Sequence, residues 1–491
     1  MYDYKNRYYA TLTVRADGST KFAPGKQWGY FPAGSIAWRI SNEKWMKPIK
    51  FISDLKLRAS YGLAGNNRIG NDLWHNIYRV YSGTSAPAFG NEEYNYYQFA
   101  DQTYLYDPDL KWETTITRNI GLDFGFFRNR LSGTVDVYWN TTKDLLVPSI
   151  IPNSSGYSRQ MTNVGQTSNK GVEISLDAKI IQTKDFQLSA NFNVAFNKNK
   201  VDKLATGETE WKTKASLSNW YGTYNYKMEV GKSMGLIYGF VNDGFYKVDD
   251  FDFDATTKKW TLKPGIPDNS SFSSGNFAFK PGAMKFKKLS DSESNLITED
   301  DMTVIGDTNP KVTGGFGLSG NWKNLDFTAF FNYMCDFDVL NVNKLYLHSA
   351  VRRNYSNLST DMNLANRFRY VDDAGVNVSS DPVALAALNE NAKTYSWMSV
   401  TQGITMTDLV EDGSFLRLST LTVGYTLPKH WLRSLGVKSL RLYFSGSNLF
   451  TITGYSGYDP EVNIQKGLTP GIDNNVTPRS RVYTVGVNLN F

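Results

Sequence analysis

Apolar and polar residues alternate along most of the chain. Stretches in which every second residue is apolar, with charged or amide-bearing residues between, are 55–61, 119–126, 172–180 and 188–196. A period of two is typical of β-strands with one apolar and one polar face. Several stretches reach the ~9–11 residues of a tilted, bilayer-crossing strand, against ~5–6 in globular proteins. About fourteen such strands predict an all-β fold, an antiparallel transmembrane β-barrel.

The connections between the predicted strands differ greatly in length. Short polar turns are expected at 127–130, 183–185 and 321–324. Long polar connections are expected roughly at 83–112, 203–225, 246–310 and 336–413, the last with a short helix at 382–393. Short turns at one end and long loops at the other are the asymmetry of outer-membrane barrels, whose long loops face outward.

The chain ends on a strand with an aromatic last residue. The final nine residues, YTVGVNLNF, present one apolar face formed by Tyr483, Val485, Val487, Leu489 and Phe491. Bacterial outer-membrane barrels present this pattern to the barrel assembly machinery, so these residues are a candidate barrel-insertion signal. The alternative is an ordinary edge strand at a chain end.

Composition supports a membrane wall and argues against other classes. The 30 Tyr, 29 Phe and 12 Trp suit aromatic girdles at two membrane interfaces. The net charge of +6 is scattered without a Lys/Arg run, so no nucleic-acid partner is predicted. The single cysteine, Cys335, excludes an intramolecular disulfide and a cysteine-built metal site. No run of 18 apolar residues predicts a transmembrane helix.

The first fifteen residues have none of the features of a signal peptide and resemble an amphipathic strand. Because an exported membrane protein needs an export signal, we expect the chain to begin within a longer protein.

Motifs of enzymes and cofactor sites are weak in this chain. Residues 315–320 fit GxGxxG by letters, but a polar turn and a strand follow where a dinucleotide site needs a helix. His75, His348 and His430 lie near no nucleophile elbow. Asp459 and Glu461 are better explained as exposed acids in a turn fixed by Pro460 than as a catalytic carboxylate pair. We therefore predict no catalytic residue, no cofactor and no enzyme activity.

An aromatic-rich loop at 94–106 (YNYYQFADQTYLY) could contact substrate. Aromatic faces beside amides and acids suit carbohydrate or peptide binding, with Trp74, Tyr94, Tyr96 and Tyr97 as candidate substrate-binding residues. The same composition also suits a loop that packs on its neighbours or on a lid protein.

A series of short motifs is spread over nearly the whole chain. They are RADGSTKF (15–22), WGYFP (28–32), AWRIS (37–41), LKLRASYGLAG (55–65), DLKWE (109–113), NKGVE (169–173), DGSFLRL (412–418), GSNLF (446–450) and GYDPE (457–461). Together they resemble the SusC/RagA-type TonB-linked (TonB-dependent) outer-membrane transporters of the Bacteroidetes.

The resemblance implies that residues 1–491 are the C-terminal part of a TonB-dependent receptor barrel. Family members have a signal peptide, TonB box and plug domain before a barrel of 22 strands, and the first three are expected to be absent here. The implied function is TonB-dependent uptake of a large nutrient, such as an oligosaccharide or peptide, across the cell outer membrane. The implied partners are a SusD-like surface lipoprotein, outer-membrane lipid and, through the missing N-terminal region, TonB–ExbB–ExbD.

One segment departs from the family pattern. Where the family often has a calcium-type loop, residues 291–297 lack the glycine that permits its sharp turn, so we predict a solvated acidic loop and no metal.

Two other functions remain open. A passive porin or autotransporter-type barrel would lack an upstream plug, and a soluble β-rich glycan-binding adhesin would be recovered without detergent.

Overall fold

The computed structural model describes residues 1–76, 78–81, 97–100, 104–157, 159–205, 207–215, 217, 224–272, 279–349, 357–397, 403–433, 436–461 and 467–491. Only the backbone is described at 78–81, 97–100, 150 and 153. Among these residues, no helix is both long and apolar enough to cross a membrane.

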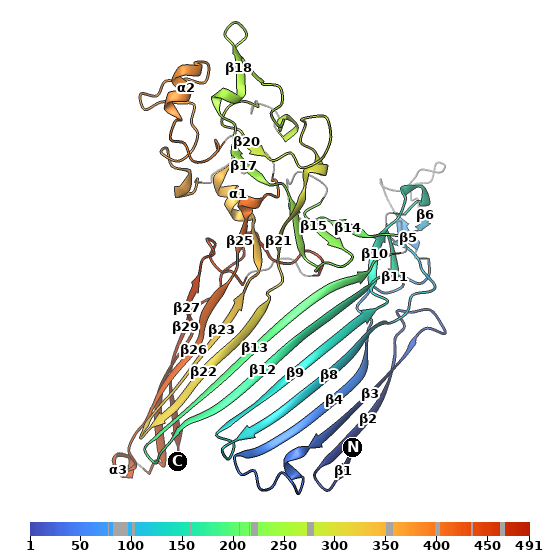
Figure 1. The fold of residues 1–491 in the computed structure, drawn as a ribbon, viewed down its shortest axis with the longest axis vertical. Coiled ribbons are helices and arrows are strands. Elements are labelled where there is room, and N and C mark those ends of the chain that lie inside the picture. Colours follow the sequence, from blue (N-terminus) through green and yellow to red (C-terminus); the bar gives the residue numbers. More distant parts are fainter. Residues whose placement is uncertain are drawn as a thin grey trace.

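A single antiparallel sheet of thirteen strands forms a tall, curved wall (Figure 1). Apart from β1, each strand has 9 to 18 residues, enough to cross a bilayer when tilted. In order across the sheet they are β1 (Tyr2–Tyr4), β2 (Tyr8–Gly18), β3 (Trp28–Arg39), β4 (Ile52–Asn66), β8 (Glu113–Phe126), β9 (Leu131–Lys143), β12 (Gln166–Gln182), β13 (Phe186–Lys203), β22 (Val312–Trp322), β23 (Leu325–Cys335), β26 (Phe415–Thr426), β27 (Ser439–Thr453) and β29 (Val482–Asn490). The predicted all-β antiparallel architecture is confirmed, with thirteen wall strands described where about fourteen were expected.

The register of the wall separates an apolar face from a polar face. Ile120, Val137, Val172 and Phe196 lie opposite one another across four strands. The neighbouring row, which points to the other face, runs from Arg58 through Gly121 and Asp136 to Glu173. A slip of one residue would exchange the two faces, so the alternation in the sequence specifies this pairing.

The two ends of the wall differ as predicted. The short turns at 127–130, 183–185 and 323–324 lie at the lower end in Figure 1, which also holds both chain termini. Phe127, Arg128, Asn129 and Lys323 take positive φ angles of 53°, 58°, 58° and 52°, which lets the chain reverse within a few residues. A short helix, α3 (Lys429–Leu432), lies in the β26–β27 connection at this end.

Long connections rise from the upper end. Beside β4, β8 and β9 a small rim cluster buries Phe22, Ile69, Leu73, Leu110 and Met161. The strands of this region are β5 (Tyr78–Tyr81), β6 (Tyr97–Ala100), β7 (Tyr104–Leu105), β10 (Leu146–Ile150) and β11 (Arg159–Asn163).

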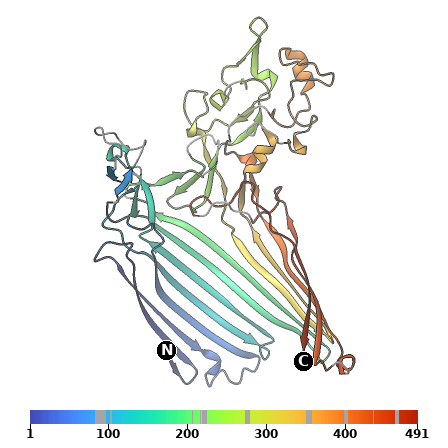
Figure 2. The same ribbon diagram turned by 180° about the vertical axis from the view of Figure 1, so that it is seen from behind.

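The connections 204–311 and 336–414 fold together into an upper module above the wall (Figures 1 and 2). Its strands are β14 (Glu210–Thr213), β15 (Tyr226–Glu229), β16 (Leu236–Gly239), β17 (Asn242–Phe245), β18 (Phe251–Asp254), β19 (Lys259–Leu262), β20 (Met284–Phe286), β21 (Thr303–Asp307), β24 (Asp338–Asn341) and β25 (Val410–Asp412), with β28 (Ile472–Asp473) pairing to β24. Its helices are α1 (Val342–His348) and α2 (Pro382–Leu388). Short 3-10 turns occur along the chain at Ile40–Asn42, Asn153–Ser155, Val248–Asp250, Ser270–Phe272, Glu299–Asp301, Thr360–Met362 and Thr407–Leu409.

These long connections share a buried core, which the sequence did not predict. They contribute most of a buried cluster of 21 apolar residues, which includes Ile237, Phe286, Leu340 and Leu345. Each segment alone has too few apolar residues to form a core, but residues from both connections bury one another. The strands at 226–245, between two predicted connections, belong to this module and not to the wall. The predicted helix at 382–393 is confirmed as α2, which begins at Pro382 after the capping residue Asp381 and ends earlier than predicted, at Leu388.

Candidate functional site

Ion pairs tie neighbouring strands together on the polar face of the wall. The Arg58 guanidinium on β4 donates through Nε to Asp123 on β8 at 2.9 Å and through Nη2 to Asp136 on β9 at 3.1 Å. Lys56 adds a contact to Asp123 at 3.7 Å. One arginine therefore bridges three strands, and its planar fork suits two carboxylates at once.

Gly121 makes room for this bridge. It lies between Arg58 and Asp136 in the register, and a Cβ built on it would stand 2.6 Å from Arg58 Nη2 and 2.5 Å from Asp136 Oδ1. A side chain at Gly121 would thus push the guanidinium off the strand. The same arrangement recurs near the other edge, where Arg441 crosses Gly424 to reach Asp326.

Arg58→Met should destabilise the wall by about 1–3 kcal/mol, because Asp123 and Asp136 would face each other without a shared cation. These side chains keep 18–31% of their exposure, so water limits the loss. The unfolding midpoint in denaturant, with the protein in detergent, measures it. The control Arg118→Met removes an arginine of the neighbouring strand β8 that has no carboxylate partner among the described residues, and it should change the midpoint less. An equal change would contradict the proposed bridge.

Asp459 and Pro460 of the GYDPE motif are buried and Glu461 is partly buried, in contrast to the exposed acids that the sequence suggested. Asp459 is 5% exposed, and Arg417 on β26 binds it at 2.5 Å while its Nη1 lies 3.3 Å from Glu461. Thr451 accepts from Arg417 Nε at 3.1 Å, and the Arg479 side chain pairs with Glu461 at 2.6 Å. The prediction of exposed acids was wrong because the arginine that buries them lies 42 residues earlier in the chain.

The acidic segment 291–296 is exposed, as expected, but the next acidic residues include one that is fully buried. Asp301 is inaccessible to solvent and accepts from Leu289 N, Ser290 N and Thr298 N at 2.8–2.9 Å. The Lys288 ammonium lies 3.1 Å from its second oxygen. Within the described part of the chain, no group of three metal-ligating side chains converges. A lysine thus neutralises this carboxylate.

The buried Asp301 carboxylate makes the stability of the upper module depend on pH. Burial raises the pKa of Asp301, but the hydrogen bonds from Ser290, Thr298 and Leu289 outweigh burial and lower the pKa to about 2. Since the unfolded value is ~3.9, the carboxylate stabilises the upper module above pH ~4, and this contribution is lost as the pH falls through about 2.

Asp301→Asn should therefore destabilise the upper module by about 2 kcal/mol at neutral pH, with the difference from wild type shrinking below pH ~3. Tryptophan fluorescence during denaturant unfolding between pH 2 and 7 measures the difference. The matched control is Asp300→Asn, which removes an exposed neighbouring carboxylate and should have little effect. A deficit of Asp301→Asn that stays constant down to pH 2 would show that the carboxylate charge is not its cause.

Of the four candidate substrate-binding residues, only Trp74 has a described side chain. Trp74 is half-buried at the rim, donates to the Thr20 carbonyl at 3.3 Å and stacks on His75 with ring centroids 4.5 Å apart. Tyr97 opens β6, where only the backbone is described, and Tyr94 and Tyr96 lie outside the described residues. Their role in binding stays a prediction.

The candidate insertion signal lies on the last strand of the sheet. In β29, Tyr483, Val485, Val487 and Leu489 point to the apolar face and are exposed, and Phe491 follows with 69% of its surface accessible. This placement agrees with the predicted alternation, and the signalling role stays a prediction. The three histidines lie apart from one another, at the rim, in α1 and in α3.

Comparisons with known proteins give one consistent result. The family model described as "TonB dependent receptor-like, beta-barrel" matches residues 1–264. The "TonB-dependent receptor P3" of Formosa agariphila is 32% identical over all of this chain and 44% of its own length. The "TonB-dependent receptor SusC" of Bacteroides thetaiotaomicron is 30% identical over all of this chain and 43% of its own length. The chain thus spans less than half the length of these relatives.

Solved structures agree in fold. The structure of the RagAB peptide transporter matches 99% of this chain and 46% of its own chain, with a TM-score of 0.73 and 26% identity. The RagAB peptide importer in an open–open state matches the whole of this chain with a TM-score of 0.71.

Proposed function

Since the chain belongs to the TonB-dependent receptor β-barrel family, we propose that it supplies one wall of a transporter that imports a large nutrient with energy from TonB. The chain is an outer-membrane β-barrel protein of SusC/RagA type. The observation that carries the proposal is the thirteen-stranded sheet, with its apolar face for lipid and an ion-paired polar face for the lumen.

Further strands must close the barrel in this proposal. The sheet is open between β1–β2 and β29, as Figures 1 and 2 show. In hydrocarbon, each unpaired backbone donor or acceptor on such an edge costs several kcal/mol. We therefore propose that the N-terminal part of the barrel and a plug, expected from the family, pair with these edges and provide the coupling to TonB–ExbB–ExbD.

The proposed substrate is an oligosaccharide or a peptide, and the proposed partner is a SusD-like lipoprotein above the rim. The peptide is favoured by the similarity to a protein described as the RagAB peptide transporter. The upper module stands above the rim, where a lid would meet the barrel (Figure 2). Trp74 and the loop aromatics Tyr94, Tyr96 and Tyr97 are the proposed substrate contacts. The proposal includes no enzyme activity.

Uptake in cells tests the proposal. A strain that lacks the full-length gene should lose uptake of labelled oligopeptides or oligosaccharides, and complementation should restore it. A protonophore should stop uptake, because TonB draws on the proton gradient. Uptake that continues with the protonophore would identify a passive porin, and recovery of the protein without detergent would identify a soluble adhesin.

A further inference from the structure

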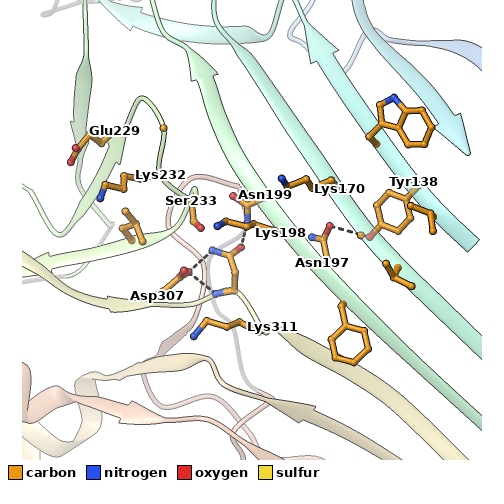
Figure 3. A pocket seen from close by; sticks show the side chains of 18 of the residues that line it. Tyr138, Lys170, Asn197, Lys198, Asn199, Glu229, Lys232, Ser233, Asp307 and Lys311 are labelled. Atoms are coloured by element: carbon orange, nitrogen blue, oxygen red, sulfur yellow. Dashed lines mark hydrogen bonds between the residues drawn. The ribbon is translucent and has the colours of Figure 1, made fainter.

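A pocket with a row of lysines lies at the upper end of the wall, between the wall and the upper module (Figure 3). It has a volume of about 1070 Å³. The upper ends of β9, β12 and β13 form one side, and the β15–β16 hairpin with β21 forms the other. Most of the wall-strand side chains that line it share the face of Val137, and the remaining ones, Tyr138, Asn197 and Asn199, belong to the polar face, where the Arg58 bridge lies.

The register fixes which side chains enter this surface. Val137, Val172 and Phe196 lie opposite one another, and two positions higher the same face carries Trp139, Lys170 and Lys198. The apolar band thus ends on one row and becomes cationic on the next. An aromatic residue beside lysines is typical of a membrane–water boundary, where Trp rings sit at headgroup level. Because the long connections face outward, this boundary belongs to the outer leaflet.

The two strand lysines form an unfavourable pair in the absence of an anion. Lys170 and Lys198 are direct cross-strand partners, and both are exposed. Like charges directly opposite on neighbouring strands destabilise a sheet. Within the described residues, neither side chain has a carboxylate at ion-pair distance, and the same holds for Lys232 across the pocket. An anion between these ammonium groups would remove the repulsion.

The facing hairpin is held firmly against the wall. Gly231 N donates to the Val201 carbonyl at 2.8 Å, and Val201 N donates to the Lys232 carbonyl at 2.9 Å. Asn199 Oδ1 accepts from Met234 N at 2.7 Å, while its amide donates to Asn309 at 2.7 Å. These bonds fix the loop that presents Lys232 and Ser233, so the spacing of the cationic groups is built into the fold.

The charge of the lining favours an anion. Four ammonium groups, of Lys170, Lys198, Lys232 and Lys311, face two carboxylates. Glu229 is paired with Lys227 at 3.4 Å, and Asp307 accepts from Asn309 N at 3.0 Å but keeps its charge, so the lining remains positive overall. Lys311 is paired with Asp336 at 2.7 Å. Among the described residues, the lysines of the lining without an ion-pair partner are Lys170, Lys198 and Lys232, and together they outweigh the charge of Asp307.

We propose that this pocket binds the phosphorylated glycolipid anchor of the outer leaflet, lipid A, with a phosphate between Lys170, Lys198 and Lys232. Its acyl chains would run down the wall over Val137, Val172 and Phe196, which line the pocket on its apolar side; Val137 and Phe196 are exposed, and Val172 is partly buried. Phosphate matches the cationic row, and several acyl chains match the wide apolar face below it. Basic groups at a membrane boundary bind lipid headgroups in this way.

Native mass spectrometry of the complete, detergent-extracted protein with purified lipid A tests the proposal. Wild type should retain lipid A and should retain its dephosphorylated form much less. Lys170→Gln/Lys198→Gln should weaken lipid A binding by roughly 25-fold, at roughly fivefold per lysine near an anionic lipid surface. The matched control, Lys258→Gln/Lys259→Gln, removes two exposed lysines at the β18–β19 turn and should bind as wild type does.

Three outcomes would overturn the proposal. Equal binding of lipid A and its dephosphorylated form would mean that the lysines do not bind the phosphate group. Competition by inorganic phosphate at the concentration of the lipid would identify a free-anion site. An equal loss in the Lys258/Lys259 control would identify non-specific charge attraction. Heat-modifiable migration of every variant on gels shows that a loss of binding is not a loss of folding.

Discussion

Arg417→Met is expected to destabilise the protein by about 3–5 kcal/mol, because it leaves the buried Asp459 and the partly buried Glu461 without their central cation. The Arg417 side chain is only 2% exposed, so water cannot replace the guanidinium. The interaction also joins β26 to the connection between β27 and β29, so the loss should release this connection from the wall. Unfolding in denaturant and limited proteolysis after residue 453 measure the two effects.

Two further variants separate charge from packing at this site. Arg417→Lys keeps the charge but loses the planar fork, so its deficit should lie between those of wild type and Arg417→Met. Arg433→Met, an exposed arginine in the neighbouring connection, should stay within about 0.5 kcal/mol of wild type. A deficit of Arg417→Met that resembles this control would show that the buried pair is not stabilising.

The wall could be predicted from the sequence because its two faces meet different surroundings. In β4, β8, β12 and β13 the alternation of apolar and polar residues predicts which side chains face lipid and which face the lumen. This prediction does not require the pairing of the strands to be known. The short turns follow for the same reason, since polar residues interrupt the pattern. Which strand pairs with which also follows from the hairpin order.

The upper module could not be predicted in this way. Its core joins residues such as Ile237 and Leu345, which belong to connections more than a hundred positions apart. No short window contains enough apolar residues to reveal that a core exists. Contacts between residues far apart in the sequence therefore form the largest buried cluster of the described chain, from two connections that look polar when each is considered alone.

The ion pairs show a similar limit. Arg58 is visible in the sequence as a polar position within an alternating strand, but its partners Asp123 and Asp136 follow only from the register of three strands. Asp459 in GYDPE has the local composition of an exposed turn, and only the distant Arg417 explains its burial. A charged residue in the middle of a long strand is a signal that could have prompted a search for such partners.

Removal of the last aromatic side chain, Phe491→Ala, is expected to deplete most of the protein from the outer membrane without destabilising the fraction that inserts. Phe491 is 69% exposed and lies just beyond β29, so its truncation removes little buried surface. A large effect must then arise before folding is complete, when the insertion machinery meets the final strand. The readout is the amount of heat-modifiable protein in outer-membrane fractions, together with the unfolding midpoint of the purified remainder.

Phe444→Ala is the matched control for this prediction, because Phe444 points to the same apolar face in the neighbouring β27 and is 38% exposed. This variant loses the same ring but keeps the carboxy-terminal aromatic, so it should accumulate almost as wild type does. Phe491→Tyr, which preserves an aromatic last residue, should also accumulate. Normal accumulation of Phe491→Ala, or equal depletion of Phe444→Ala, would show that the terminal ring is not an insertion signal, and β29 would then be an ordinary edge strand.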